Sequence, residues 1–262
     1  MFVEFFMTKE SAKNLLPAWM LHLYWLARVL RVKIIKWIPK YDEDELMTAH
    51  SCDFINEESF RRCYDGAVRE GLAVSTTIRW RAHVACWAAM RGRGLDGDFV
   101  ECGVNKGFLS KIVMQYIGFE GLSKKFWLLD TFEGFADEYL TQSERQKYLA
   151  MGNIYEPCHE MVCRTFAHME NVEIVRGAVP DTLPRVTSER IAYLSIDMNC
   201  VRPEIAAAEF FWPRLVPGAT MLLDDYGHAG HELQKEAFDQ FSVRHGVPIL
   251  TLPTGQGVIV KP

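Results

Sequence analysis

The stretch "DFVECGVNKGFLSKIVMQYIGF", residues 98–119, decides the fold because a short apolar run leads directly into a glycine-containing turn and a helical pattern. Four further apolar runs follow, mostly without polar alternation, at 125–130, 172–177, 191–197 and 219–225. Strands that are buried on both faces have this composition. The five runs therefore predict a buried sheet.

Helical patterns separate these runs, and they lie at 107–119, 157–169, 203–215 and 231–246. Strands that alternate with helices indicate an α/β fold with a parallel sheet covered on both faces. Residues 247–262 carry two apolar runs around a Pro/Gly-rich turn, which predicts a closing antiparallel hairpin. A further helix is predicted within 75–94, with Ser75 or Thr76 as its N-cap and Gly92 and Gly94 at its end.

Residues 15–40 form a predicted helical arm in which large apolar side chains are interleaved with Lys and Arg. Its uninterrupted apolar part is shorter than the roughly 20 residues that span a bilayer. The arm could pack on the main domain or a dimer partner, or lie in the plane of an anionic membrane surface. Residues 42–60 are acidic and polar, as in a linker. We therefore divide the chain into an arm with a linker (1–74) and a main domain (75–262).

Composition excludes several classes of protein. A net charge of −5 and a pI near 5.9 give no general attraction to nucleic acid. Seven cysteines without a C-x-x-C pair predict neither a disulfide framework nor a zinc site, which fits a reducing cytoplasm. The N-terminus lacks the pattern of a secretory signal. We expect a cytoplasmic homodimer, with membrane-surface contact as the alternative role of the arm.

In open parallel sheets, ligands bind beyond the carboxyl ends of the strands. The first run places Glu101 at this end, with Gly103 and Gly107 in the following turn. Glycine there lets a ligand approach the backbone, although close helix packing also favours it. The second run ends in Asp130, where nucleotide-binding folds hold the ribose hydroxyls; a turn cap is the alternative role.

Three further acids follow the next strands along this edge. Asp197 ends one predicted strand, and Asp224 and Asp225 end another. Adjacent strands lie about 4.8 Å apart, so these carboxylates could meet. Each would have a raised pKa unless a cation lay between them, and several oxygen ligands favour Mg²⁺ or Ca²⁺ over zinc. Capping of the following helices is the alternative.

Six motifs, in order and spacing, carry a family resemblance: "GDFVECGVNKG", "LLDTFEG", "VRGAVPDTL", "AYLSIDMN", "LVPGATMLLDDYG" and "GQGVIV". They resemble the class I S-adenosylmethionine-dependent methyltransferases of the macrocin O-methyltransferase (TylF/MycF/NovP) type over about residues 75–262. The resemblance implies a mostly parallel seven-stranded sheet. It also implies methylation of a sugar hydroxyl on a glycosylated small molecule, with Mg²⁺ held by strand-end aspartates.

Carried over by position, the resemblance assigns S-adenosylmethionine to the first two strand ends. Its methionine part would lie against Glu101 and Gly103, and its ribose against Asp130. The complete set of expected cofactor-binding residues is Glu101, Cys102, Gly103, Gly107, Asp130, Thr131, Phe132 and Gly177, with Gly177 beside the adenine. The expected metal ligands are Asp197, Asp224 and Asp225.

The position two residues after Asp197 departs from the family pattern. The family's second acid, which takes the proton of the acceptor hydroxyl, corresponds to Asn199, and an amide is no base at neutral pH. Either a metal alone activates the hydroxyl, or Asn199 binds the metal or substrate, or another base serves. His228 and His231 follow the acid pair, and histidine is the natural general base near pH 7.

The connection over 135–161 is longer than most and predicts a lid or binding loop, with Tyr139, Tyr148, Tyr155 and His159 as candidate substrate contacts. Packing of the lid is the alternative for each of them. Two other functions stay open. An NAD-dependent oxidoreductase would need the G-x-G-x-x-G fingerprint that the first turn lacks. A non-catalytic member of the fold could keep the cofactor or metal without turnover.

Overall fold

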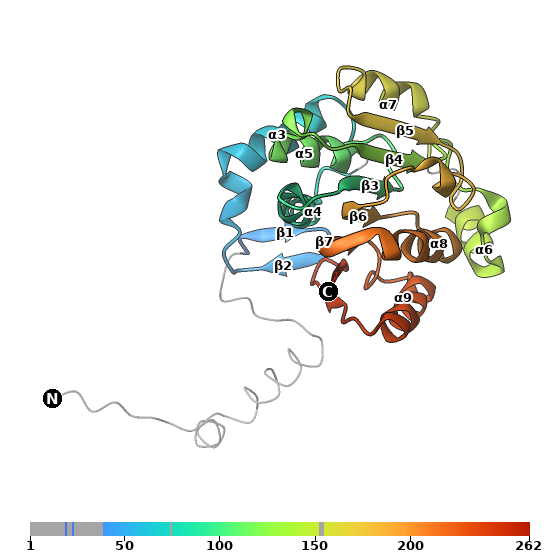
Figure 1. The fold of residues 1–262 in the computed structure, drawn as a ribbon. Helices are drawn as coiled ribbons and strands as arrows, with labels where there is room; N and C mark the ends of the chain where they lie inside the picture. The colour runs from blue at the N-terminus through green and yellow to red at the C-terminus, as the bar shows by residue number, and fades with distance from the viewer. Residues whose placement is uncertain (1–18, 20–22, 24–38, 74, 152–154) are drawn as a thin grey trace.

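The structure is a computed structural model, and it describes residues 19, 23, 39–73, 75–151 and 155–262 (Figure 1). Almost all of the basic, aromatic arm at 15–40 lies outside these residues, so its packing or membrane contact stays a prediction. Among the described residues, no helix combines the length and hydrophobicity that crossing a bilayer requires.

A seven-stranded sheet forms the centre of the molecule, in the order β5-β4-β3-β6-β7-β9-β8. Its first five members in this order pair in parallel, whereas β9 is antiparallel to both β7 and β8. The predicted sheet and closing hairpin are therefore confirmed. The strands are β3 (Asp98–Cys102), β4 (Phe126–Asp130), β5 (Val172–Arg176), β6 (Ile191–Ile196), β7 (Leu215–Leu223), β8 (Leu250–Thr251) and β9 (Gly257–Val260).

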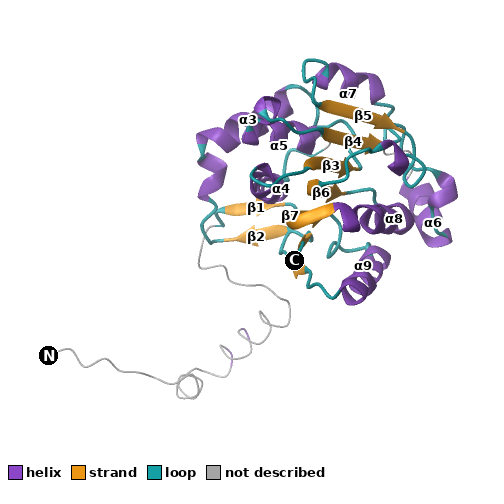
Figure 2. Ribbon diagram, viewed as in Figure 1, coloured by secondary structure: helices purple, strands orange, loops and turns teal. Residues whose placement is uncertain are grey.

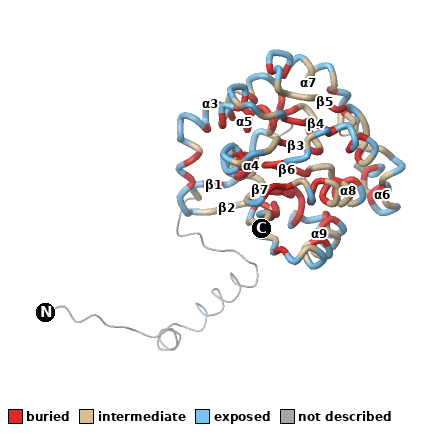
Figure 3. The backbone as a smooth tube through the Cα atoms, viewed as in Figure 1, coloured by how far each residue is buried: buried red, intermediate tan, exposed pale blue. Residues whose placement is uncertain are grey.

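Helices cover the sheet on both sides (Figure 2). Helices α4 (Arg79–Arg93) and α5 (Phe108–Ile117) pack together, with α3 (Glu58–Arg69) against α5. Helices α8 (Val201–Phe211) and α9 (Glu232–His245) pack together at β6. Helix α6 (Gln142–Met151) lies in the predicted lid, and α7 (His159–Phe166) packs on β5. The buried residues follow the central strands and the helix faces that touch them (Figure 3).

The start of α4 differs from the prediction. The helix begins at Arg79, and neither Ser75 nor Thr76 caps it. Instead, the hydroxyl of Tyr64 accepts a hydrogen bond from the Ile78 N–H (3.2 Å), and that of Tyr41 accepts one from the Trp80 N–H (3.1 Å). Two distant tyrosines thus satisfy backbone donors that a local Ser or Thr would otherwise take.

The end of α4 also differs from the prediction at Gly92. This residue is buried inside the helix, where a Cβ would lie 2.8 Å from the carbonyl oxygen of Ala192. Gly92 therefore lets the helix approach β6 closely, and α4 ends only at Arg93, before Gly94.

The linker interpretation of residues 42–60 is wrong, because this segment folds onto the domain. Strands β1 (Tyr41–Glu43) and β2 (Leu46–Thr48) form an antiparallel hairpin, and Tyr41 is buried. A 3₁₀ turn over Asp53–Asn56 follows and places Phe54 in the core. The division of the chain at residue 75 into an arm and a domain stays a prediction.

The neighbouring strands β3 and β6 come into close contact at their carboxyl ends. Gly103 follows β3 with a φ of +90°, and a Cβ on it would lie 1.7 Å from the carbonyl oxygen of Asp197. No other residue fits there without moving the backbone. The chain leaves β3 and β6 towards opposite faces of the sheet, so this edge is the topological switch point where α/β folds bind ligands.

Candidate active site

A cavity of about 400 Å³ opens at this switch point. Of the fourteen residues expected to act in catalysis, cofactor binding or metal binding, twelve line it: Glu101, Gly103, Asp130, Thr131, Phe132, Gly177, Asp197, Asn199, Asp224, Asp225, His228 and His231. Two do not. Cys102 is fully buried in the core, and Gly107 begins α5 where a Cβ would lie 2.8 Å from the Phe166 ring.

The carboxylate of Asp130 organises the side of the cavity where the sequence predicts the cofactor, called the cofactor side below. Its Oδ2 accepts the N–H groups of Val104 (2.7 Å) and Asn105 (2.8 Å), and its Oδ1 accepts that of Phe132 (2.6 Å). Asp130 therefore fills the turn-stabilising role that the sequence left open. The Thr131 hydroxyl also lies 3.3 Å from Oδ1, but its shorter contact is with the Gly134 carbonyl. A carboxylate has about four acceptor positions, so one remains for a ligand hydroxyl when Thr131 donates to Gly134. Its contact with a ribose stays a prediction.

Glu101 lies at the floor of the same side. It is buried, and its Oε2 accepts a hydrogen bond from the Ser110 hydroxyl (2.9 Å). Burial raises the pKa of Glu101 to about 8, and the nearby charge of Asp130 adds to this effect. An ammonium group in the cavity would stabilise the ionised form of this carboxyl.

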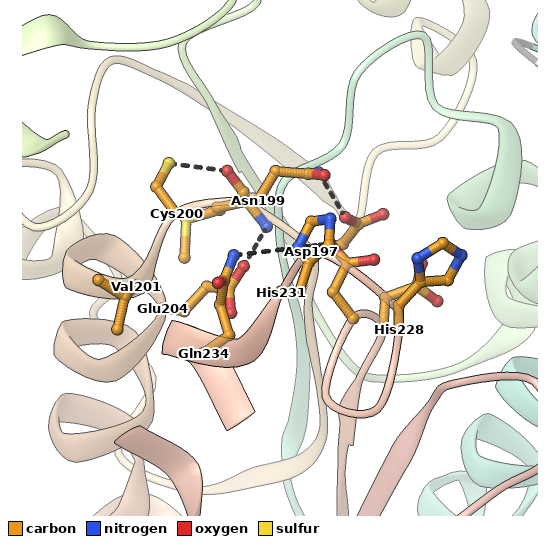
Figure 4. Close-up of polar contacts among 12 residues, drawn as sticks. Asp197, Asn199, Cys200, Val201, Glu204, His228, His231 and Gln234 are labelled. Carbon is orange, nitrogen blue, oxygen red and sulfur yellow. Dashed lines mark hydrogen bonds and ion pairs between the residues drawn. The ribbon is translucent and has the colours of Figure 1, made fainter. Parts of the chain in front are cut away.

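The three predicted metal ligands meet on the other side of the cavity. One carboxylate oxygen from each of Asp197, Asp224 and Asp225 lies within 4.8 Å of the other two. Asp197 follows β6 and the acid pair follows β7, so the pairing of these strands brings the groups together. Figure 4 shows Asp197 between Asn199, His231 and His228.

Only one cationic side chain is paired with this acidic cluster in the described residues. Arg81 Nη1 lies 2.6 Å from Asp224 Oδ2, and the amide of Gln256 donates to Asp224 Oδ1 (3.0 Å). The guanidinium offsets at most one of three charges. When all three acids are ionised, at least two negative charges remain, which is the charge of one divalent cation.

The electrostatic state of the cluster fits a bound divalent cation. Burial, and then the charge of Asp224, raises the pKa of Asp197 well above its usual value and that of Asp225 to about 7. Asp225 Oδ2 is buried without a hydrogen-bond partner. His231 Nδ1 lies 3.3 Å from it but outside hydrogen-bonding geometry. A buried, unpartnered carboxylate oxygen is costly unless a cation binds it.

Asn199 lies beside the cluster, as its position in the sequence predicted. Its Nδ2 donates to Asp197 Oδ1 (3.0 Å), so the amide orients this carboxylate. The residue has a φ of +57°, in the left-handed region that Asn tolerates better than most residues. The hydroxyl of Tyr148 donates to the Asn199 carbonyl and holds this conformation.

The two candidate histidines have different surroundings. His231 is buried: its Nδ1 lies 3.1 Å from the Gln234 amide and its Nε2 lies 3.4 Å from Lys147 Nζ. Burial, and then the charge of Lys147, lowers the pKa of His231 to about 4. His228 lines the cavity, and among the described residues its ring has one polar contact, from Nδ1 to the Ala229 carbonyl (3.3 Å). His228 is the more available of the two.

Of the four candidate lid contacts, only Tyr155 lines the cavity. The Tyr139 hydroxyl donates to Asp181 (2.6 Å), and the His159 ring packs against Phe132. Tyr148 is buried and stacks on Phe135, with ring centroids 3.9 Å apart. The structural alternative therefore holds for three of the four.

Helix α6 contacts both loops that carry the acids. The buried carboxylate of Glu144 accepts the N–H groups of Thr141 (2.7 Å) and Val201 (2.8 Å), and Val201 begins α8. Lys147 Nζ donates to the carbonyl of Gly230 (2.9 Å), in the loop after β7. One face of α6 therefore joins the two loops.

Sequence reasoning missed Arg81, Gln256 and the contacts of α6. Nothing near Arg81 in the sequence indicates its partner, because 143 residues separate it from Asp224. A signal did exist for α6: "TQSE", residues 141–144, has the Thr-x-x-Glu pattern of a capping box.

A family model described as macrocin-O-methyltransferase (TylF) matches residues 44–251. The chain belongs to this family. The match begins within the β1–β2 hairpin, 31 residues before the resemblance found in the sequence (75 − 44 = 31), and it includes every expected site residue. Membership also favours a methyltransferase over the oxidoreductase alternative.

Two curated relatives are similar to part of the chain. One is the 8-demethyl-8-(2,3-dimethoxy-alpha-L-rhamnosyl)-tetracenomycin-C 4'-O-methyltransferase of Streptomyces olivaceus, 27% identical over 62% of this chain and 64% of the relative. The other is the mycinamicin III 3''-O-methyltransferase of Micromonospora griseorubida, 26% identical over 59% of this chain and 63% of the relative. The matches span less than two thirds of either relative.

The solved structure of the O-methyltransferase NovP has a similar fold. It superposes with a TM-score of 0.64 over 77% of this chain and 96% of NovP, at 19% identity. The agreement confirms the class I methyltransferase fold expected from the motifs.

Proposed function

We propose that the protein is a Mg²⁺-dependent S-adenosylmethionine O-methyltransferase that acts on a hydroxyl of a sugar or of a glycosylated small molecule. The observation that carries this proposal is the trio of aspartates that lines one cavity, with Asp224 and Asp225 buried and Asp225 Oδ2 unpartnered. The names of the two curated relatives, both O-methyltransferases of glycosylated compounds, support the acceptor class.

Each side of the cavity has a defined task in this proposal. On the cofactor side, Glu101 and Asp130 offer carboxylates to the ammonium and ribose groups, and Gly103 lines the cavity where the methionine part would lie. On the other side, Asp197, Asp224 and Asp225 would hold Mg²⁺, which lowers the pKa of an acceptor hydroxyl when bound. The chain positions the acceptor oxygen in line with the methyl group and the departing sulfur.

The proton of the acceptor needs a base other than Asn199. We assign this role to His228, because it lines the cavity and its ring has one weak polar contact among the described residues. His231 has both ring nitrogens near other groups and a lowered pKa, which suits a positioning role. Asn199 orients Asp197.

The experiment is methyl transfer from radiolabelled S-adenosylmethionine to a panel of glycosides, with MgCl₂ or with EDTA. We expect transfer that EDTA abolishes, together with calorimetric binding of S-adenosylmethionine but not of NAD. Cofactor binding without transfer to any glycoside would favour the non-catalytic alternative. Transfer that persists in EDTA would remove Mg²⁺ from the proposal and leave the methyltransferase intact.

The homodimer, the cytoplasmic location and the role of residues 15–40 also stay proposals. Light scattering of the chain with and without its first forty residues tests whether the arm packs on a partner. Sedimentation with anionic liposomes tests the membrane surface. A shift from dimer to monomer on deletion supports packing, and loss of liposome binding supports the membrane.

A further inference from the structure

Arg81 lies between two acids from distant parts of the chain. Its Nε and Nη2 bind both carboxylate oxygens of Asp44 (2.7 and 2.8 Å), and its Nη1 binds Asp224 Oδ2 (2.6 Å). The three side chains are 15%, 10% and 7% exposed. A bidentate, largely buried pair fixes the plane of a guanidinium far better than a single contact does.

Asp44 has a backbone conformation that few residues adopt. It and Glu45 form the two-residue turn between β1 and β2, with φ values of +52° and +59°. This turn favours Asn, Asp and Gly, because other residues enter the left-handed region at a cost. The hairpin is docked on the start of α4 by the Tyr41 contact with Trp80 and by an ion pair between Glu43 and Arg79.

We propose that Asp44 is a positioning residue that acts through Arg81 on the metal ligand Asp224. This inference rests on the proposed function. Asp44 occupies two of the three guanidinium nitrogens, so Arg81 reaches Asp224 with one nitrogen, on Oδ2. Gln256 takes one position on Oδ1, so about two of the four acceptor positions of this carboxylate remain for a cation. Without Asp44, the nearest anionic partners of the guanidinium are the acids of the cluster, and Arg81 competes with Mg²⁺ for them.

The hairpin is therefore part of the metal site, although it lies about 150 residues before the first metal ligand in the sequence (197 − 44 = 153). Outer partners of metal ligands typically change metal affinity 10- to 100-fold when they are replaced. Asp44 contacts Arg81 and not the metal ligand itself, so we expect its replacement to change the Mg²⁺ affinity by an amount at the lower end of this range.

The test compares Asp44→Asn with Asp42→Asn in the full chain. Asn suits the turn at position 44, so the substitution removes the charge and keeps the hairpin. Asp42 is an exposed acid on the same hairpin. Calorimetric titration with MgCl₂ should show about tenfold weaker binding for Asp44→Asn and no change for Asp42→Asn. Binding of S-adenosylhomocysteine should stay within twofold of the wild type for both.

A second pair of variants tests whether the loss of Mg²⁺ affinity passes through the Arg81 guanidinium or comes directly from the missing charge of Asp44. If Asp44 acts through Arg81, Asp44→Asn should cause no further loss of Mg²⁺ affinity in an Arg81→Gln background. A simple loss of negative charge near the site would persist in that background and overturn the proposal. Wild-type Mg²⁺ affinity in Asp44→Asn would also overturn it. Absence of Mg²⁺ binding by the wild-type protein would instead refute the metal site itself, and this inference with it.

Discussion

Single residues in the cavity have two tasks at once, structural and chemical. Asp130 holds the turn after β3 while it lines the predicted cofactor side of the cavity, and Asn199 orients Asp197 while it occupies the position where the family resemblance implies an acid. Substitution of either residue should therefore change both the stability of the protein and its binding of a ligand or metal. The relative size of the two effects shows which task dominates.

Asp130→Ala should weaken S-adenosylhomocysteine binding by about 1.5–3 kcal/mol, because a charge-assisted bond to the ribose is lost. It should also lower the melting temperature, because the N–H groups of Val104, Asn105 and Phe132 lose their acceptor. Calorimetry and thermal unfolding measure the two effects. A lower melting temperature with unchanged affinity would leave Asp130 only its structural task.

Asn199→Asp should make the stability of the protein depend more strongly on Mg²⁺ than that of the wild type does. The new carboxylate replaces an amide that donates to Asp197 Oδ1, so it adds repulsion to an already crowded cluster. In EDTA the melting temperature should fall, and saturating MgCl₂ should restore it, because a ligand that binds only the folded state stabilises it. An equal loss with and without Mg²⁺ would place the repulsion outside a metal site.

At the scale of elements, α6 is the link between the lid and the acid-bearing loops. Its inner face packs Tyr148 with Leu140 and Cys200 in a small cluster apart from the main core. Tyr148 and Glu144 of this helix also bind the Asn199 carbonyl and the Val201 N–H. Helix α6 therefore holds Asn199 and the start of α8 together.

Glu144→Ala should destabilise the protein by about 1–3 kcal/mol, because the partly buried N–H groups of Val201 and Thr141 lose their acceptor. Urea unfolding measures the loss, and hydrogen exchange should increase at residues 199–201. Glu138 is an exposed acid of the same lid, so Glu138→Ala is the matched control. Similar effects of both variants would contradict a specific role for Glu144.

The elements that the sequence predicted and those that it missed differ in physical origin. The buried strands were found because apolar runs are local, and each lies within a few residues of its observed bounds. The cap of α4 depends on Tyr41 and Tyr64, 39 and 14 residues from the groups they satisfy. The β1–β2 hairpin has an acidic turn and only three residues in each strand, so no alternation marks it.

At the scale of the whole molecule, the sheet gathers on one edge acids that the chain distributes from Glu101 to Asp225. The strand-end rule was sufficient to predict this gathering, because it depends only on parallel pairing. The partners of these acids, Arg81 and Gln256, could not be predicted, since their contacts depend on how helices and loops pack. Acids on this edge that lack a cationic partner in the described part of the chain have raised pKa values. The free energy of unfolding of the whole protein therefore depends on pH.

Without Mg²⁺, the free energy of unfolding should fall as pH rises from about 6.5 to 8. Glu101 and Asp225 have folded-state pKa values of about 8 and about 7, above those of an unfolded chain. The folded state therefore holds more protons across this range, and stability falls with pH. His231 has the opposite sign, because its pKa is lowered to about 4. An unfolded histidine is half-protonated near pH 6.5, so this opposing contribution is largest at the lower end of the range and is outweighed by the two carboxyls.

Thermal unfolding in EDTA at pH 6.5, 7.2 and 8.0 tests this balance. Glu101→Gln keeps an acceptor for the Ser110 hydroxyl and removes the titrating group, so it should reduce the slope at the upper end of the range. Saturating MgCl₂ should reduce the remaining slope, because the cation takes the place of the proton on Asp225. A melting temperature that stays constant or rises from pH 6.5 to 8 would show that these carboxyls are already ionised in the folded protein, and that another cation of the chain compensates them.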